Sequence, residues 1–187
     1  HYGSDTLTAY LLSIADEAGY TIPEDSFARM QQGLTGFIEG SVVRGSVLNT
    51  ADLAVRKIAA MEALSRYANV PFKPEWLDSF SHTPNLWPTT ALLDWIAIHE
   101  RIDSLPQRDA RLREARAILK SRLNFSGTAM TFSTERDDAW WWLMWNGDVN
   151  ANRLLLAAND DPAWKDDIGR LVRGTSLICS TPAGTMK

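Results

Sequence analysis

The helical character of this chain is clearest in the stretch NTADLAVRKIAAMEALSRYA, residues 49–68. Its apolar residues recur at three- and four-residue steps, at Ala54, Ile58, Met61, Leu64 and Ala68. This spacing is typical of an α-helix with one buried face, and Asn49 or Thr50 is a suitable N-cap. The stretch therefore predicts a strongly patterned helix that packs against other elements.

The same period extends outward in both directions from this helix. Further helices are predicted after Ser4 or Asp5, after Pro23, after Pro88, after Pro106, in the tryptophan-rich segment, through RLLLAA, and from Pro162 to Val172. The first two helices are expected to end at Gly19 and Gly40, because glycine adopts the left-handed conformation that terminates helices. The expected apolar stripes are Leu7, Tyr10, Leu11, Ile14 and Ala18; Phe27, Met30, Leu34 and Phe37 or Ile38; Trp95, Ile98 and Ile102; and Leu112, Ala115, Leu119 and Leu123.

Two stretches interrupt the helical pattern. PFKPEWLDSFSHTPNLWP, residues 71–88, contains four prolines and predicts a loop with one short helical turn around Trp76. FSGTAMTFS, residues 125–133, is the one extended candidate and is expected to form an arm of a short β-hairpin. The sequence thus predicts an all-α fold of consecutive helix hairpins, which stack into solenoids or closed rings.

Length and charge exclude several classes of protein. The chain has 187 residues and a formal net charge of -4, with 19 basic and 23 acidic residues interspersed. One domain is the default at this length, and the charge offers no footprint for nucleic acid or anionic lipid. No apolar run approaches the roughly 20 residues that cross a bilayer. The first residues, HYGSDTL, read like the middle of a longer sequence, so an excised fragment is expected.

The stretch DDAWWWLMWNGDVNANRLLLAAND, residues 137–160, contains four tryptophans: Trp140, Trp141, Trp142 and Trp145. Three adjacent residues sweep about 200° around a helix, so these side chains cannot share one face. A helix that is apolar nearly all round belongs between two helical layers, and core packing is the preferred interpretation. A membrane-surface helix would need basic flanks, whereas the flanks here are acidic.

A sugar-binding platform is the remaining interpretation of the tryptophans. A carbohydrate-active enzyme would also need two carboxylates across a cleft, one of them with a raised pKa. The candidates are Glu75, Asp78, Glu135, Asp137 and Asp138. Clustered acids are more often solvated loop or cap residues, so this enzyme is kept as the alternative.

Other chemistry has little support. His1, His82 and His99 are isolated from carboxylates at metal-ligand spacing, which argues against a zinc site. His99 is expected at a helix end, where it would compensate the helix dipole. Cys179, the single cysteine, has no basic neighbour and is interpreted as a small residue in a tail. We therefore expect no catalytic residue, no cofactor and no metal in this chain.

Two motifs, in their order and separation, resemble those of the alpha-2-macroglobulin and complement family. Residues 6–12, TLTAYLL, are similar to the helix that follows the thioester segment. The stretch AWWWLMWNGDVNANRLLLAANDDP resembles a late helix pair of the bacterial members: aromatics, an Asp-Val-Asn cap at Asp148, Val149 and Asn150, an apolar run, a turn at Pro162, then LVRG at Leu171 to Gly174. The resemblance covers roughly residues 3 to 175.

The resemblance implies a thioester-type helical domain, an α/α toroid, of a bacterial macroglobulin-like protease inhibitor. In that family a protease cleaves a bait region elsewhere in the molecule and is then caged or covalently captured. The bacterial members are usually periplasmic and lipid-anchored and guard the cell envelope. By this resemblance the partners are other domains of the parent protein and, through them, proteases.

The sequence departs from the family pattern in three places. No Cys-x-Glu-Gln thioester tetrapeptide occurs in the chain, and Cys179 is followed by Ser, Thr and Pro. The segment GFIEGSVVRGS, residues 36–46, lacks the histidine of members that transfer to hydroxyl groups. The tail SLICSTPAGTMK, residues 176–187, does not match the expected inner helix. Covalent capture by this chain is therefore not expected.

These observations predict a partial thioester-type domain over residues 1–175 and an atypical tail over residues 176–187. The chain is expected to be an inert piece of a protease inhibitor, not an enzyme. With about four of six hairpins present, it should form an open crescent. Self-association is expected through the helix faces around Leu7, Leu11 and Ile14 at one end and Leu171 at the other.

Overall fold

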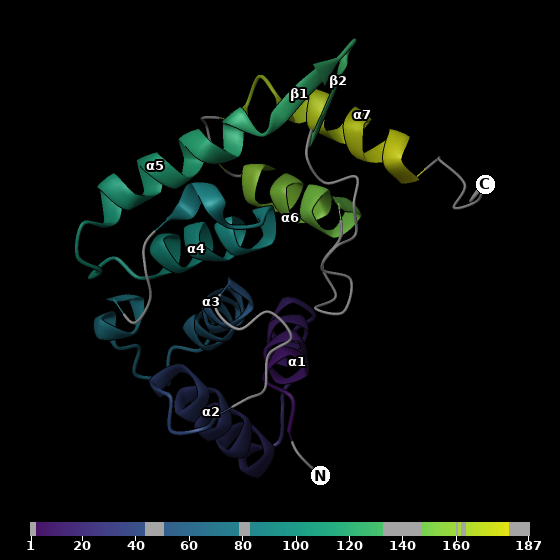
Figure 1. The fold of residues 1–187 in the computed structure, drawn as a ribbon. Coiled ribbons are helices and arrows are strands. Elements are labelled where there is room, and N and C mark those ends of the chain that lie inside the picture. Colours follow the sequence, from purple (N-terminus) through teal and green to yellow (C-terminus); the bar gives the residue numbers. More distant parts are fainter. Residues whose placement is uncertain are drawn as a thin grey trace, which may run out of the picture. The chain divides into compact units, whose positions relative to one another are not determined.

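The computed structural model describes residues 3–43, 51–78, 83–132, 147–159, 161 and 164–179. It confirms the all-α class with a short β-hairpin (Figure 1). The described chain divides into two compact units, residues 1–116 and 117–187. No helix in the described ranges is long and apolar enough to span a bilayer.

Unit 1, residues 1–116, is built around one central helix. Its helices are α1 (Asp5–Glu17), α2 (Glu24–Glu39), α3 (Ala51–Ser65), α4 (Thr89–Arg101) and the greater part of α5 (Arg108–Ser121). Helix α3 packs against α1, α2 and α4 (Figure 1). Its predicted stripe is buried at Ile58, Met61 and Leu64, but Ala60 and Ala63 are fully buried too. A helix with neighbours on several sides needs apolar or small residues on more than one face.

Local sequence signals explain the helix ends in unit 1. The Ser4 side chain accepts a hydrogen bond from the Leu7 amide and caps α1, as expected. Gly40 takes the left-handed conformation, φ 81°, directly after α2. Between α3 and α4, the proline-rich loop holds two short 3₁₀ helices, η1 (Pro74–Asp78) and η2 (Pro84–Leu86). The first of these is the turn predicted around Trp76.

Unit 2, residues 117–187, contains the end of α5, the hairpin and two helices. The strands β1 (Leu123–Ser126) and β2 (Ala129–Phe132) pair antiparallel around Gly127, whose φ is 61°. Helix α7 (Ile168–Cys179) packs on β2 and on α6 (Gly147–Asn159) (Figure 1). The hairpin was expected near residues 125–133, and both of its arms lie in residues 123–132.

Two predicted helix boundaries are wrong. Helix α5 ends at Ser121, and Leu123 belongs to strand β1. The last helix begins at Ile168, not after Pro162, and continues past Val172 to Cys179. The backbone amides of Trp164 and Asp167 bond to carbonyls three residues earlier, as in a 3₁₀ turn, so the α-helical ladder starts later. Helix α7 thus crosses the boundary at residues 175 and 176 that the sequence predicted.

Helix α1 buries one face and exposes the apolar face around Leu7, Leu11 and Ile14, and the exposure of that face was expected. The buried residues of α1 are Asp5, Ala9, Leu12 and Ala15. The expected stripe is solvent-exposed, with Leu7 at 48%, Tyr10 at 43%, Leu11 at 44% and Ile14 at 40%. Ala9 and Ala15 are small residues on the inner face, where Leu12 is the one large apolar side chain that is buried.

Candidate functional site

A shallow hollow lies on the outer face of α2. It has a volume of about 450 Å³ and is lined by Ala28, Gln31, Gln32, Thr35, Gly36, Glu39 and Ser41. These residues recur along one side of α2 and continue into the turn that follows it. Ala28 and Gly36 have little or no side chain and leave room above the helix backbone. The other lining residues supply amide, hydroxyl and carboxylate groups for hydrogen bonds. The hollow is therefore suited to holding neutral polar groups.

The carboxylate of this hollow is held ionised. Glu39 accepts a hydrogen bond from Lys73 Nζ at 2.5 Å and from Trp76 Nε1 at 3.1 Å, both acting on Oε1. The Lys73 hydrogen bond first, and then that from Trp76, lower the pKa of Glu39 below its usual value. The Trp76 ring is itself fixed by burial and by an edge contact with Phe72, with centroids 5.2 Å apart. A carboxylate with a lowered pKa is unsuited to act as a general acid.

A second cluster of charges joins three helices inside unit 1. Glu62 on α3 is 3% exposed and accepts hydrogen bonds from Arg66, Arg101 and Ser13. Arg66 also reaches Asp16 and Glu17 at the end of α1. Burial, the largest single effect, lowers the pKa of Arg66, but the charges and hydrogen bonds of Glu62 and Glu17 together outweigh it and raise that pKa. Every charge in this cluster has an opposite partner, so we assign it to holding α1, α3 and α4 together.

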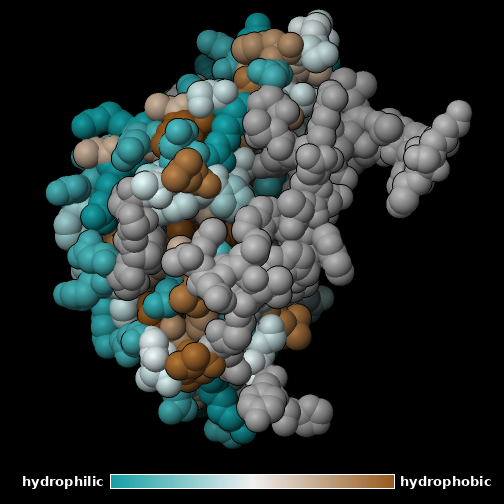
Figure 2. All heavy atoms as spheres, in the orientation of Figure 1, coloured by the Kyte–Doolittle hydropathy of each residue, from teal (hydrophilic) through white to brown (hydrophobic). Residues whose placement is uncertain are grey.

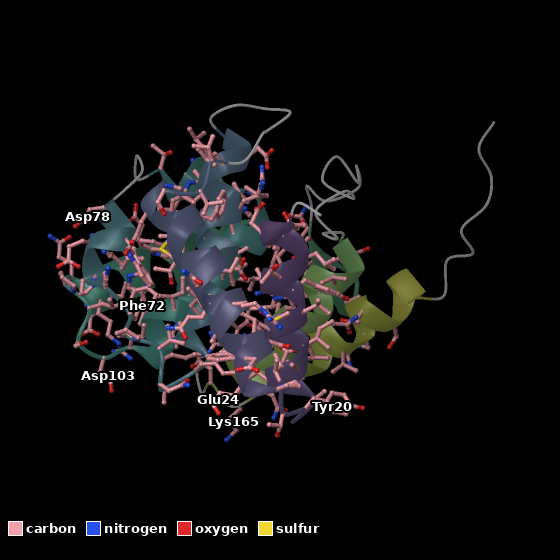
Figure 3. The ribbon with its side chains drawn as sticks, turned by 90° about the horizontal axis from the view of Figure 1, so that it is seen from below. Tyr20, Glu24, Phe72, Asp78, Asp103 and Lys165 are labelled. Atoms are coloured by element: carbon pink, nitrogen blue, oxygen red, sulfur yellow. The ribbon has the colours of Figure 1, made fainter. Side chains whose placement is uncertain are left out.

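The acids proposed for sugar cleavage do not form a catalytic pair where the structure describes them. Glu75 and Asp78 both lie on the 3₁₀ helix η1, and both are exposed. Asp78 pairs with Arg111 at 3.6 Å and lies at the outer edge of the view in Figure 3. Glu135, Asp137 and Asp138 lie outside the described residues, as do the four clustered tryptophans Trp140, Trp141, Trp142 and Trp145.

His99 occupies the last turn of α4, as expected, but its contacts are those of a core residue. The side chain is 0% exposed, its Nδ1 donates to the Trp95 carbonyl at 2.8 Å, and its ring lies 4.3 Å from the Trp95 ring. His1 and His82 lie outside the described residues, and nothing is described of the Cys179 side chain. Among the residues that are described, no cluster of three potential metal ligands occurs.

Sequence reasoning missed the hollow on α2. The signal was present as glycine and alanine among polar residues, but Gly33 and Gly36 suggest only a weakened helix end. In the structure α2 continues to Glu39, and Gly36 serves a different purpose. A Cβ there would meet Val42 Cγ2 at 2.9 Å and Ser41 Oγ at 3.0 Å. The missing side chain therefore allows the turn after α2 to fold back and close one end of the hollow.

The motif LVRG forms a contact between α7 and the hairpin in unit 2. Leu171 is buried, and Arg173 Nε donates a hydrogen bond to the Thr128 carbonyl at 2.8 Å. A Cβ on Gly174 would collide with the Met130 carbonyl, so only glycine permits this approach of helix and strand. Burial of Leu171 also corrects the prediction that it lies on an exposed face.

The other motifs of the resemblance are placed as follows. Ala9 and Leu12 of the TLTAYLL segment face the inside of unit 1, and Leu7, Tyr10 and Leu11 face outward. The expected Asp-Val-Asn cap is not a cap, since residues 148–150 lie within the first turn of α6, which begins at Gly147. Comparisons with protein-family models, with curated proteins and with solved structures found no match to this chain.

Proposed function

We propose that this chain is a helical domain of a macroglobulin-like protease inhibitor of the bacterial envelope. In this proposal it contributes surfaces to the inhibitor and carries no chemistry of its own. Its partners are the other domains of the same protein and, through them, the attacking protease. The proposal rests on the motif resemblance of residues 3 to 175 and on the places that those motifs take in the fold.

The observation that carries the proposal furthest is the LVRG contact. Leu171, Arg173 and Gly174 each make a different contact with the rest of unit 2: burial, a hydrogen bond and a close backbone approach. These contacts give each residue of the motif a distinct structural role, and this supports the proposal that the resemblance is more than chance. The toroid expected of such a domain remains part of the proposal.

The alternative, a carbohydrate-active enzyme, receives less support. Such an enzyme needs two facing carboxylates about 5 to 10 Å apart, one of them with a raised pKa. Of the described acids, Glu75 and Asp78 are exposed on one short helix, and the pKa of Glu39 is lowered instead of raised. The described residues thus favour a binding or scaffolding domain over a glycosidase.

The proposal is tested on the full-length product of the gene that encodes this chain. A protease caged by an inhibitor loses access to large substrates but still cleaves small peptides. We therefore expect that trypsin pre-incubated with the full-length protein no longer cleaves casein. The same trypsin should continue to hydrolyse a small chromogenic peptide. Equal loss of both activities would indicate an active-site inhibitor, and loss of neither would contradict the proposal.

Two further measurements separate this proposal from its alternatives. Cell fractionation should place the full-length protein with periplasmic membranes, as expected for a lipid-anchored protein of this family. The chain itself should gain no mass from methylamine, because it lacks a Cys-x-Glu-Gln tetrapeptide. Release of reducing sugar from polysaccharides would support the enzyme instead.

A further inference from the structure

The side chains that line the hollow on α2 have hydrogen-bonding groups that the described chain does not use. Gln31, Gln32 and Thr35 make no hydrogen bond or ion pair with the described residues. Each glutamine amide offers two N–H donors and a carbonyl acceptor, and the threonine hydroxyl both donates and accepts. Residues at these steps lie on one side of a helix, so their polar groups are close together. The hollow therefore presents donors and acceptors side by side.

Glu39 supplies a fixed acceptor at one end of the hollow. Its Oε1 accepts both the Lys73 and the Trp76 hydrogen bond, and no described group donates to its Oε2. An ionised carboxylate has about four acceptor sites on its two oxygens, so Oε2 can accept from two further donors. The buried Trp76 side chain holds the carboxylate in place. A ligand in the hollow thus meets an acceptor whose position is already set.

The charges around the hollow favour a neutral ligand. Glu39 is the one charged residue of the lining, and Lys73 already lies within hydrogen-bond distance of it. A cationic ligand would have to compete with Lys73 for the carboxylate, and an anionic ligand would be repelled by it. The other lining groups are amides, hydroxyls and small side chains. Recognition therefore depends on hydrogen bonds to neutral groups.

Hydroxyl groups match this lining better than peptide groups do. A sugar hydroxyl both donates and accepts, so neighbouring hydroxyls can donate to Glu39 and accept from a glutamine amide. The volume of about 450 Å³ is within the usual range of small-molecule sites, but those sites are mostly apolar and enclosed. Teal atoms are visible at the lower end of Figure 2, where α2 lies in Figure 1, so polar side chains reach the surface there. An open, polar hollow suits one unit of a longer, hydrated chain.

We propose that the hollow on α2 binds one unit of a neutral, hydroxyl-rich oligosaccharide. Gln31, Gln32 and Thr35 exchange hydrogen bonds with its hydroxyls, and Glu39 Oε2 accepts from two of them. Ala28 leaves room for the sugar ring. The site binds and does not cleave, because its carboxylate is ionised and the lining contains no second one. This binding site goes beyond the proposed function and does not depend on it.

The first experiment is a nuclear magnetic resonance titration of the isotope-labelled full chain. Sugar hydroxyls replace water at polar groups with little net gain, so we expect a dissociation constant of about 1 mM. Maltotetraose, cellotetraose and chitotetraose are each added to about 10 mM. At least one should give saturable shifts in the backbone amides of residues 28–41 and in the side-chain amides of Gln31 and Gln32. Shifts with none of these sugars, or unsaturable shifts spread over the chain, would overturn the proposal.

Matched variants of α2 test the role of the amides. Gln31→Met and Gln32→Met together keep the side-chain length but remove both amides, and should weaken binding about tenfold or more. Arg29→Met is the control, because Arg29 is exposed on the same helix but does not line the hollow. It should bind like the wild-type chain. Equal weakening by the double variant and the control would contradict the proposal.

A steric variant tests the hollow while its polar groups stay in place. Ala28 is exposed and leucine is a good helix former, so Ala28→Leu should fold normally and fill the space that the sugar ring needs. Binding should be lost, and undiminished affinity would show that the sugar binds elsewhere.

A blocked tetra-alanine peptide separates hydroxyl recognition from peptide recognition. It offers the hollow peptide groups without hydroxyls and should bind more weakly than the best tetrasaccharide. Equal or tighter binding of the peptide would overturn the assignment to a saccharide. None of these titrations involves a protease, so their failure leaves the proposed function standing, and the reverse also holds.

Discussion

Helices α1 and α4 both contain 13 residues and are similarly rich in apolar side chains, yet they are used in opposite ways. Helix α4 buries ten of its residues, including Thr89, Asp94 and His99. Helix α1 buries four, of which two are alanines, and presents Leu7, Tyr10, Leu11 and Ile14 to solvent. The comparison teaches that an apolar stripe identifies a contact surface without saying whether the contact lies within the chain or with another molecule.

The largest expected effect comes from matched aromatic truncations in these two helices. Trp95 of α4 is fully buried and contacts Trp87 and His99, so Trp95→Ala should lower the free energy of unfolding by about 3 to 5 kcal/mol. Tyr10→Ala in α1 should change it by no more than about 0.5 kcal/mol. Urea denaturation followed by circular dichroism measures both. Similar losses for the two variants would mean that α1 is as enclosed as α4.

Helix α7 offers a second comparison. There a backbone carbonyl, not a side chain, limits how closely the helix approaches strand β2. Gly174→Ala should cost about 1 to 3 kcal/mol, since the new methyl group must displace the Met130 carbonyl. Gly169→Ala is the control in the same helix: its Cβ would meet only Arg173 Nη1, at 3.7 Å. That substitution should be neutral or stabilising by up to about 1 kcal/mol. Thermal melts of both variants test the pair, and equal destabilisation would refute the role of Gly174.

The sequence predicts what depends on neighbouring residues and misses what depends on distant ones. Pro88, Ser4 and Gly40 act locally, and the helix ends that they predict are confirmed. The direction of α1 depends on Arg56 and Arg66, which lie about fifty residues away in sequence. No periodicity within α1 could reveal those ion pairs.

The candidate site was missed for a similar physical reason. The hollow on α2 exists because the turn at Ser41 and Val42 folds back over Gly36, and because Lys73 reaches Glu39 from another segment. Each feature alone looks like ordinary surface. The helix-dipole interpretation of His99 likewise considered only its position in α4, whereas its contacts are with the Trp95 ring and carbonyl.

The smallest expected effect concerns the hydrogen bond between α1 and Tyr67, which lies two residues past the end of α3. Tyr67 donates to the Leu12 carbonyl at 2.8 Å, and Tyr67→Phe should cost about 0.5 to 1.5 kcal/mol. Burial first, and the charge of Asp16 second, raise the pKa of Tyr67 above its ordinary value of 10.0. Below pH 10 the phenol is protonated in both states; above it the unfolded chain ionises first, so this contribution to stability is lost as the pH rises.

The pH dependence of unfolding measures this effect. Between pH 9 and about 11, stability of the wild-type chain should fall more steeply than that of Tyr67→Phe, because the variant has no phenol to ionise. The two chains should differ by a constant amount below pH 9. Parallel curves through the alkaline range would contradict a raised Tyr67 pKa while leaving the hydrogen bond intact.

The central claim is that α1 turns Leu7, Tyr10, Leu11 and Ile14 outward. Hydroxyl-radical footprinting with mass spectrometry tests this directly, because it reports the exposure of individual side chains. In dilute solution Tyr10, 43% exposed, should be oxidised readily, while Trp95, 0% exposed, should be protected. Protection of Tyr10 equal to that of Trp95 would contradict the account.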